Sequence, residues 1–184
     1  LDLDESLQIL NEALKLCKHS KAKRARVLYE MGFTYSKMQD MERALDLYSQ
    51  AKDAAATNKD RVLMPTILND MGYAHVFIGQ YKRAGNLVES ALDLRWERVR
   101  YLETQLSRLK EKTEAEQISN LKQQRDKLEQ DLLDARLKLG MSFNTIGQIK
   151  RFDGDQSAAT GAYSEALEIF KVANDYLWQA SALH

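Results

Sequence analysis

Two long stretches of the chain, 99–113 and 118–139, carry mostly apolar residues at alternating intervals of three and four positions, with Thr113 and Arg125 as the polar exceptions. This is the spacing of one face of an α-helix. Proline, which breaks helix interiors, occurs once, at Pro65, and residues 86–139 contain neither proline nor glycine. Alanine, leucine, glutamate, lysine, glutamine and arginine dominate that interval, and all of them favour helix. The pattern therefore predicts an all-α protein with long helices.

Elsewhere the apolar positions follow an internal repeat that is anchored on Gly32, Gly72 and Gly147. Each glycine has large apolar residues four positions and one position before it, alanines twelve and nineteen positions after it, and a further shared position at sixteen. In chain order these positions hold Leu28, Met31, Ala44, Tyr48 and Ala51, then Leu68, Met71, Ala84, Val88 and Ala91, and then Phe143, Ile146, Ala159, Tyr163 and Ala166. Glycine and alanine let two helix backbones approach closely, so the repeat predicts pairs of antiparallel helices. Because one pair cannot bury its apolar face alone, neighbouring pairs should stack into a solenoid.

The repeat resembles the tetratricopeptide repeat family, in which large-x-x-apolar-Gly-x-x-Tyr precedes Ala-x-x-x-aromatic-x-x-Ala. Tyr35 matches the tyrosine position, whereas His75 and Lys150 depart from it. The distance from Gly32 to Gly72 is 40 residues, against about 34 in the standard repeat. Longer repeats of this kind are similar to those of kinesin light chains, bacterial peptide-sensing regulators and the sensor regions of bacterial signalling ATPases.

The glycine anchor also divides the chain into segments. We expect tetratricopeptide-repeat-like (TPR-like) repeats at 21–58, 59–94 and 137–173, and an inserted coiled coil at 95–136 that extends the flanking helices. Residues 1–20 would form the second helix of a truncated repeat, and residues 174–184 would begin another. The fold class predicted is thus a TPR-like helical-hairpin solenoid with an inserted antiparallel coiled-coil hairpin, taken from a longer array.

The insertion is predicted from the interval between Gly72 and Gly147, which is 35 residues longer than the 40-residue repeat. Thirty-five residues are five heptads, so the added length keeps an apolar stripe in phase. This stripe is a candidate coiled-coil seam, made of Val99, Leu102, Leu106, Leu109, Ile118, Leu121, Leu128 and Leu132.

Two geometries are compatible with this seam. An antiparallel hairpin would turn near Lys112 to Gln117, where the stripe lapses. One continuous helix of about 54 residues would instead pair with another chain and would reach roughly 80 Å. The absence of glycine and proline between 111 and 118 favours the continuous helix. Short antiparallel connections are the rule of the repeat itself, and for that reason we favour the hairpin.

The resemblance implies a concave groove that is lined by the first helix of each repeat. The groove positions carried over by the glycine anchor are Tyr29, Phe33, Lys37, Asn69, Tyr73, Val76, Asn144, Gln148 and Arg151. Asn69 and Asn144 share one repeat position, and asparagine can both donate to and accept from the backbone of an extended peptide. The alternative is that both amides pair with polar groups between helices. Glu30 and Asp70 stand where a dicarboxylate clamp would tolerate no acid, so capture of a C-terminal carboxylate is not expected.

The charge balance restricts the class of partner. Lysine and arginine total 27 and aspartate and glutamate total 27, so the formal net charge is zero, which disfavours binding to nucleic acid or to an anionic membrane. A basic run at Lys15, Lys18, Lys21, Lys23, Arg24 and Arg26 either meets solvent or contacts an anionic partner. No apolar run of membrane-spanning length and no signal peptide is visible.

The sequence lacks the usual signatures of catalysis. No zinc-protease, phosphate-loop, dinucleotide or nucleophile-elbow motif occurs, and the single cysteine, Cys17, has no histidine partner nearby in sequence. We therefore predict a non-enzymatic, cytoplasmic protein with no cofactor and no metal site. It would be an interaction scaffold that binds a peptide or protein segment, as the sensor portion of a larger bacterial signalling protein. The alternative is a structural or oligomerisation module that self-associates through the 95–136 coiled coil.

Overall fold

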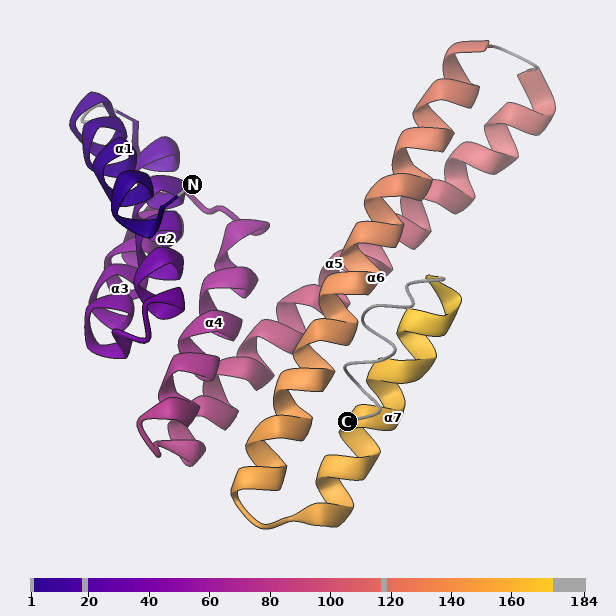
Figure 1. Cartoon of the computed structure of the whole chain (residues 1–184). Coiled ribbons are helices and arrows are strands. Elements are labelled where there is room, and N and C mark those ends of the chain that lie inside the picture. Colours follow the sequence, from indigo (N-terminus) through magenta and orange to yellow (C-terminus); the bar gives the residue numbers. More distant parts are fainter. Residues whose placement is uncertain (1, 18–19, 117–118, 174–184) are drawn as a thin grey trace. The chain divides into compact units, whose positions relative to one another are not determined.

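The computed structural model describes residues 2–17, 20–116 and 119–173, and side chains are not described for 112–120. Within these ranges all regular structure is helical (Figure 1). The helices are α1 (Leu3–Leu16), α2 (Lys21–Lys37), α3 (Met41–Thr57), α4 (Leu63–Phe77), α5 (Tyr81–Glu116), α6 (Ser119–Phe152) and α7 (Gln156–Val172). The predicted all-α, TPR-like fold class is confirmed. The chain forms two compact units, Leu1–Ala91 and Leu92–His184, and α5 belongs in part to each.

The turns between paired helices are specified by two recurring devices. An aspartate caps the second helix of a pair: Asp40 accepts from the Arg43 backbone N–H at 3.1 Å, and Asp155 accepts from the Ala158 N–H at 3.0 Å. The residue before each capping aspartate has a left-handed backbone, with φ of 62° at Gln39 and 87° at Gly154. Glycine adopts this conformation without steric cost, whereas glutamine does not. The same turn is therefore built in both units.

In the first unit, α1 packs on α2, and α2 packs on α3 and α4. Their common core is dominated by small side chains around a few large ones. It consists of Ala25, Leu28, Tyr29, Ala44, Tyr48, Ala51, Ala55, Leu63, Ile67 and Met71. Because alanine carries only a methyl group, the axes of α2 and α3 can lie close together, and the ring of Tyr48 fills the remaining space.

The anchor glycines lie at these close contacts, as the repeat predicted. A Cβ atom added at Gly32 would lie 2.7 Å from Cδ1 of Tyr48, and one at Gly147 would lie 2.5 Å from Cε1 of Tyr163. Gly72 faces Val88 in the same way. The interpretation of these glycines as helix-contact positions is confirmed. Gly140 makes a similar contact with Phe170, which the sequence pattern did not identify.

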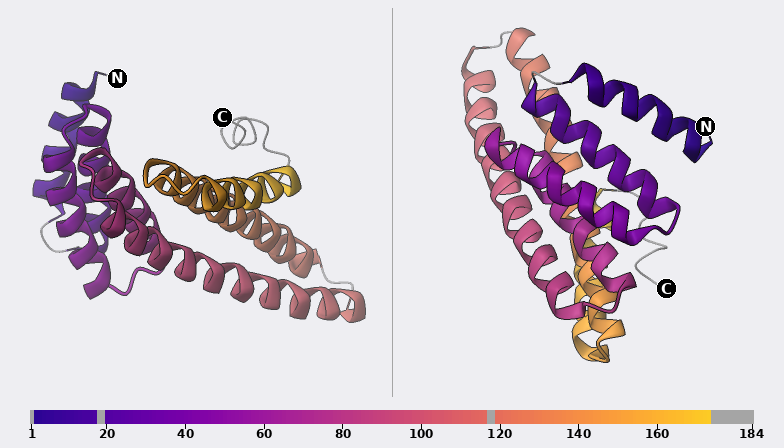
Figure 2. Two further views of the ribbon diagram at one scale, coloured as in Figure 1. Left: turned by 90° about the horizontal axis from the view of Figure 1, so that it is seen from below. Right: turned by 90° about the vertical axis from the view of Figure 1, so that its left-hand side faces the viewer.

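In the second unit, α6 and α7 form the next antiparallel pair, seen side by side in Figures 1 and 2. Residues 92–116 of α5 run antiparallel to α6. Glu103 pairs with Arg136 at 2.7 Å, and Lys110 lies 3.8 Å from Glu129. Between these two pairs the residue number rises by seven on α5 and falls by seven on α6. Buried side chains from α5 and α6 pack together in one apolar cluster, which consists of Val99, Leu102, Leu106, Leu132, Ala135 and Leu139.

The seam residues are distributed unevenly in this pair of helices. Val99, Leu102, Leu106 and Leu132 are buried, whereas Leu109, Leu121 and Leu128 are half-buried. Ile118 lies outside the described residues, as does the predicted segment 174–184. The helices of the predicted 95–136 segment continue without interruption into their neighbours at both ends. Heptad packing of a coiled coil stays a prediction.

Arg95 of α5 is the one buried arginine among the described residues. Its guanidinium Nη1 donates to the hydroxyl of Ser142 at 2.6 Å and to the backbone oxygen of Lys138. A buried guanidinium is costly unless it is hydrogen-bonded, so these contacts fix the position of α6 on α5.

Candidate peptide-binding face

The predicted groove residues of the first unit lie on α2 and α4, which pack against each other. The Tyr29 hydroxyl donates to Oδ2 of Asp70 at 2.8 Å, and the Asn69 amide donates to Oδ1 of the same carboxylate at 3.3 Å. Because α3 reverses the chain between them, α2 and α4 run in the same direction. Residues one and two turns beyond this contact therefore occupy equivalent places on the two helices.

These next turns carry exposed aromatic side chains and one cation. Phe33 follows Tyr29 by one turn, and their rings stack with centroids 6.3 Å apart. The ammonium of Lys37 lies 4.6 Å from the Phe33 ring centroid. On α4, the rings of Tyr73 and Phe77 meet edge to face at 5.0 Å. We call the exposed set Phe33, Lys37, Tyr73 and Phe77 the aromatic face.

Three predicted groove residues of the first unit, Tyr29, Asn69 and Val76, are buried and lie outside this set. Val76 is only 7% exposed, whereas Phe77, the next residue, is 55% exposed. The reason is the helical register: Phe77 follows Tyr73 by four residues, as Lys37 follows Phe33, and a spacing of four keeps side chains on one face. Extending the i, i+4 spacing of the α2 positions to α4 would have selected Phe77 from the sequence.

The two asparagines are less accessible than peptide-gripping residues need to be. Asn69 and Asn144 are each 5% exposed, and the Asn69 amide is bonded to Asp70. This burial supports the alternative in which the amides satisfy neighbouring polar groups between helices. Direct contact between these asparagines and a peptide stays a prediction.

The remaining predicted positions, Asn144, Gln148 and Arg151, lie on α6 in the second unit. Gln148 is half-buried and Arg151 is exposed. The Arg151 guanidinium lies 5.5 Å from the ring centroid of Phe152, which is itself exposed. A cation beside an aromatic ring thus recurs here, although the cation and the ring are neighbours in sequence. That these residues contact a peptide stays a prediction.

Burial holds three titratable side chains near the face, Tyr29, Tyr48 and His75, in their neutral forms. Burial, reinforced by the Asp70 carboxylate, raises the pKa of the Tyr29 hydroxyl, and burial also raises the pKa of Tyr48. Burial, with added repulsion from Arg83, lowers the pKa of His75. Among the described residues, no three histidine, cysteine or acidic side chains are grouped so that they could hold a metal ion. The chemistry of this face is therefore that of aromatic and hydrogen-bonding surface.

The basic run is spread over an exposed surface. Lys21, Lys23, Arg24 and Arg26 lie in the first two turns of α2 with their side chains exposed. Arg26 approaches Glu30 at 3.8 Å. Lys15 is paired with Glu12 at 2.7 Å, and Lys18 lies outside the described residues. An anionic partner for this run stays a prediction. None of the described helices is both long and apolar enough to cross a membrane.

Comparison with known proteins agrees with this geometry. Residues 23–95, which include all of α3 and α4, match the family model of the tetratricopeptide repeat. Residues 23–95 are therefore similar to tetratricopeptide repeats. Repeats of this family generally act as scaffolds for protein–protein interaction and are typically non-catalytic.

Two solved structures are similar to the chain. BtubC (BKLC) from P. vanneervenii is 16% identical, with a TM-score of 0.49, and the match covers 95% of this chain and 76% of that one. A protein from Podosopora anserina, described as a kinesin light chain with nearly identical TPR-like repeats, is 12% identical. Its TM-score is 0.47, and the match covers 98% of this chain and 83% of that one. No curated protein matches the sequence.

Proposed function

We propose that this chain is a non-catalytic scaffold that binds a peptide or protein segment along the aromatic face of α2 and α4. The observation that supports it is the exposure of Phe33, Tyr73 and Phe77 at equivalent positions of two successive first helices. Exposed aromatic rings are costly to leave in water, and they give large contact areas with little loss of side-chain entropy on binding.

The face is also rigid before any partner arrives. Tyr29 and Asn69 both donate hydrogen bonds to the Asp70 carboxylate beneath it, and the Tyr29 ring is stacked on Phe33. A surface that is already ordered loses little conformational entropy on association, so more of the contact energy appears as affinity. The predicted positions Asn144, Gln148 and Arg151 belong to the second unit, and we propose them as peptide-contacting residues of that unit.

The wider role that we propose is that of a sensor portion of a larger bacterial signalling protein in the cytoplasm, with no nucleic acid as partner. The balanced charge of the sequence supports the last point. The rival proposal is an oligomerisation module that works through residues 95–136. It is less well supported, because Val99, Leu102 and Leu132 are already buried within the same chain.

A peptide selection tests the proposed binding. Peptides would be selected by display against the full chain, and their affinities would then be measured for wild type, a Phe33→Ala/Tyr73→Ala double variant and Val62→Ala. Val62 is an exposed apolar residue at the start of α4, away from the aromatic face, and serves as the matched control. We expect the double variant to lose at least tenfold in affinity and the control to lose almost none. Equal affinities for all three proteins would overturn the proposal.

A further inference from the structure

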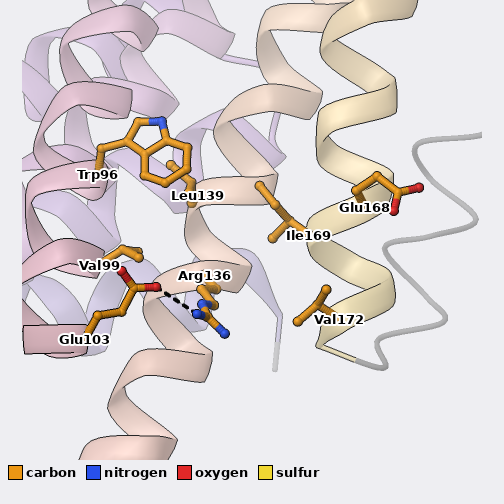
Figure 3. A pocket seen from close by; sticks show the side chains of 8 residues that line it. All are labelled: Trp96, Val99, Glu103, Arg136, Leu139, Glu168, Ile169 and Val172. Atoms are coloured by element: carbon orange, nitrogen blue, oxygen red, sulfur yellow. Dashed lines mark hydrogen bonds and ion pairs between the residues drawn. The ribbon is translucent and has the colours of Figure 1, made fainter. Parts of the chain in front are cut away.

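The second unit contains an apolar cavity that the repeat pattern does not require. It has a volume of about 320 Å³ and lies between α5, α6 and α7 (Figure 3). Its walls are formed by Trp96 and Val99 of α5, Leu139 of α6, and Ile169 and Val172 of α7. Val99 and Leu139 are buried and form the floor, whereas Trp96 is 40% exposed and Val172 is 72% exposed.

The length of α5 explains why this cavity exists. The last alanine of the preceding repeat is Ala91, and α5 continues for another 25 residues to Glu116. Trp96 and Val99 lie on this continuation and supply a wall opposite α7. The Trp96 indole on α5 and Val172 on α7 are partly exposed, and they form apolar surface that a partner can bury. Contiguous surface of this kind marks interaction sites.

Charged side chains around the cavity are mainly acidic. The lining includes Glu103, which is paired with Arg136 at 2.7 Å, and Glu168, which is paired with Lys171 at 2.8 Å. A second hollow is lined by Asp93, Glu97 and Arg100 together with the Trp96 indole. Within the described part of the chain, neither Asp93 nor Glu97 forms an ion pair or a side-chain hydrogen bond.

Trp96 thus lines both the apolar cavity and the second hollow, where Asp93 and Glu97 share the lining with Arg100 but form no ion pair with it. Taken together, the two hollows are lined by four acidic residues and two arginines. A negatively charged ligand would meet these carboxylates and be repelled. A lysine or arginine would be attracted, and it would gain most beside Asp93 and Glu97, because the other two acids are already paired.

We propose that this cavity is a docking site, separate from the aromatic face, for a partner segment that presents a large apolar side chain beside a lysine or arginine. The apolar side chain fills the space between Trp96, Ile169 and Val172. The cation reaches Asp93 and Glu97 across the indole, where a cation–π contact with Trp96 adds to the attraction. All residues of the site belong to the second unit, and none belongs to the aromatic face.

Fluorescence of Trp96 provides a direct test. The sequence contains two tryptophans, so a Trp178→Phe variant of the full chain leaves Trp96 as the sole reporter. The probe is a 12-residue peptide that repeats Lys-Leu-Ala-Lys three times, with capped ends. Two controls replace every lysine by glutamate or every leucine by alanine. We expect the probe to shift Trp96 emission with saturation, and both controls to bind at least tenfold more weakly.

Surface variants then assign the binding to the cavity. Val172→Lys blocks the apolar wall, and Asp93→Lys/Glu97→Lys reverses the charge beside Trp96; we expect each to weaken the probe at least tenfold. Val62→Lys, at another exposed valine, is the matched control and should not change the affinity. The substituted side chains are exposed, so we expect each variant to fold. Circular dichroism checks this.

Several results would overturn the proposal. Equal binding of the leucine-free peptide would mean that charge alone attracts the probe. Equal binding by Val172→Lys would place the contact elsewhere on the chain. A shift of Trp96 emission with protein concentration, without peptide, would make a second copy of the chain the occupant. Loss of probe binding in Phe33→Ala/Tyr73→Ala would assign the probe to the aromatic face instead, so the two proposals can fail separately.

Discussion

Two kinds of helix pair occur in this chain, and they bury their contacts in opposite ways. In the α2/α3 pair, the residues at the contact are small: Gly32, Ala44 and Ala51 let the backbones approach around one tyrosine ring. In the α5/α6 pair, the contact is made by large aliphatic residues such as Leu102 and Leu139. The first arrangement fixes how close the helices lie, whereas the second obtains its stability from buried apolar area.

This difference predicts how each pair responds to substitution. A contact between small residues has no room for added atoms, so it is sensitive to gains in volume. A contact between large residues is sensitive to losses, because each deleted methylene removes burial and leaves a cavity. The repeat pair is therefore a fixed unit for presenting surface residues, and the extension is a rod whose stability depends on its leucines.

The largest expected effect is the loss of a leucine from the α5/α6 pair. Leu102→Ala should lower the free energy of unfolding by about 2–5 kcal/mol, because Leu102 is 1% exposed and its side chain would leave a cavity. Urea denaturation followed by circular dichroism at 222 nm measures this change. Tyr101→Ala, at the exposed neighbouring residue, is the matched control and should cost about 0.5 kcal/mol or less. Similar losses for the two variants would contradict the described packing.

The next effect tests the small-residue contact. Gly32→Ala should cost about 1–3 kcal/mol, because the added methyl group overlaps the buried ring of Tyr48. Gly85→Ala is the matched substitution inside a helix where an added Cβ meets no atom within 4 Å. It should raise stability by about 0.5–1 kcal/mol, since alanine loses less backbone entropy than glycine. The prediction fails if both variants shift the urea midpoint in the same direction.

A pH effect should belong to the first unit, where His75 is buried in α4. Its pKa is lowered in the folded protein, mainly by burial. The unfolded chain therefore binds a proton first, near its ordinary pKa of about 6.5. Stability is present above this pH and is lost as the pH falls towards the folded pKa. Urea midpoints at pH 7.5 and 5.5 should differ in the wild type and differ less in His75→Phe; an unchanged difference would exclude His75 as the cause.

The smallest effect concerns the ion pairs that join α5 to α6. Glu103 and Arg136 are 2.7 Å apart, but both side chains are partly exposed. Exposed pairs contribute about 0.2–1 kcal/mol, and salt weakens them. A double-mutant cycle of Glu103→Gln and Arg136→Gln, repeated at low and high salt, measures this coupling. A coupling above about 2 kcal/mol would mean that charge, and not leucine packing, holds the extension together.

Much of the repeat could be predicted from the sequence because its contacts are local. The glycine at Gly147 and the tyrosine sixteen residues later contact each other within one helical hairpin, so their spacing alone identifies them. The burial of Arg95 could not be predicted in this way. It depends on Ser142 and Lys138, which are more than 40 residues away and come near only when α6 returns along α5.

Some residues of the candidate site could be predicted from the sequence, and others could not. Phe33 and Tyr73 follow from the glycine anchor, and the structure leaves both exposed. Val76 was predicted and Phe77 was not, although a spacing of four residues from Tyr73 selects Phe77. Asn69 is polar and could be expected to face a ligand, but its amide is turned to Asp70. The cavity beside Trp96 has no signal in the repeat at all, because α7 and the continuation of α5 form it together.

Site-specific photo-crosslinking tests the central claim, that exposed residues of successive first helices form the recognition surface. A benzophenone amino acid would be placed singly at Phe33, Tyr73 or Phe77, and for comparison at Val62, Ile9 or Tyr101, which are also exposed. Each protein would be irradiated with a display-selected peptide, and the covalent products would be quantified by mass spectrometry. The account predicts crosslinks from the first three positions and almost none from the others. Crosslinks of equal yield from both sets would contradict it.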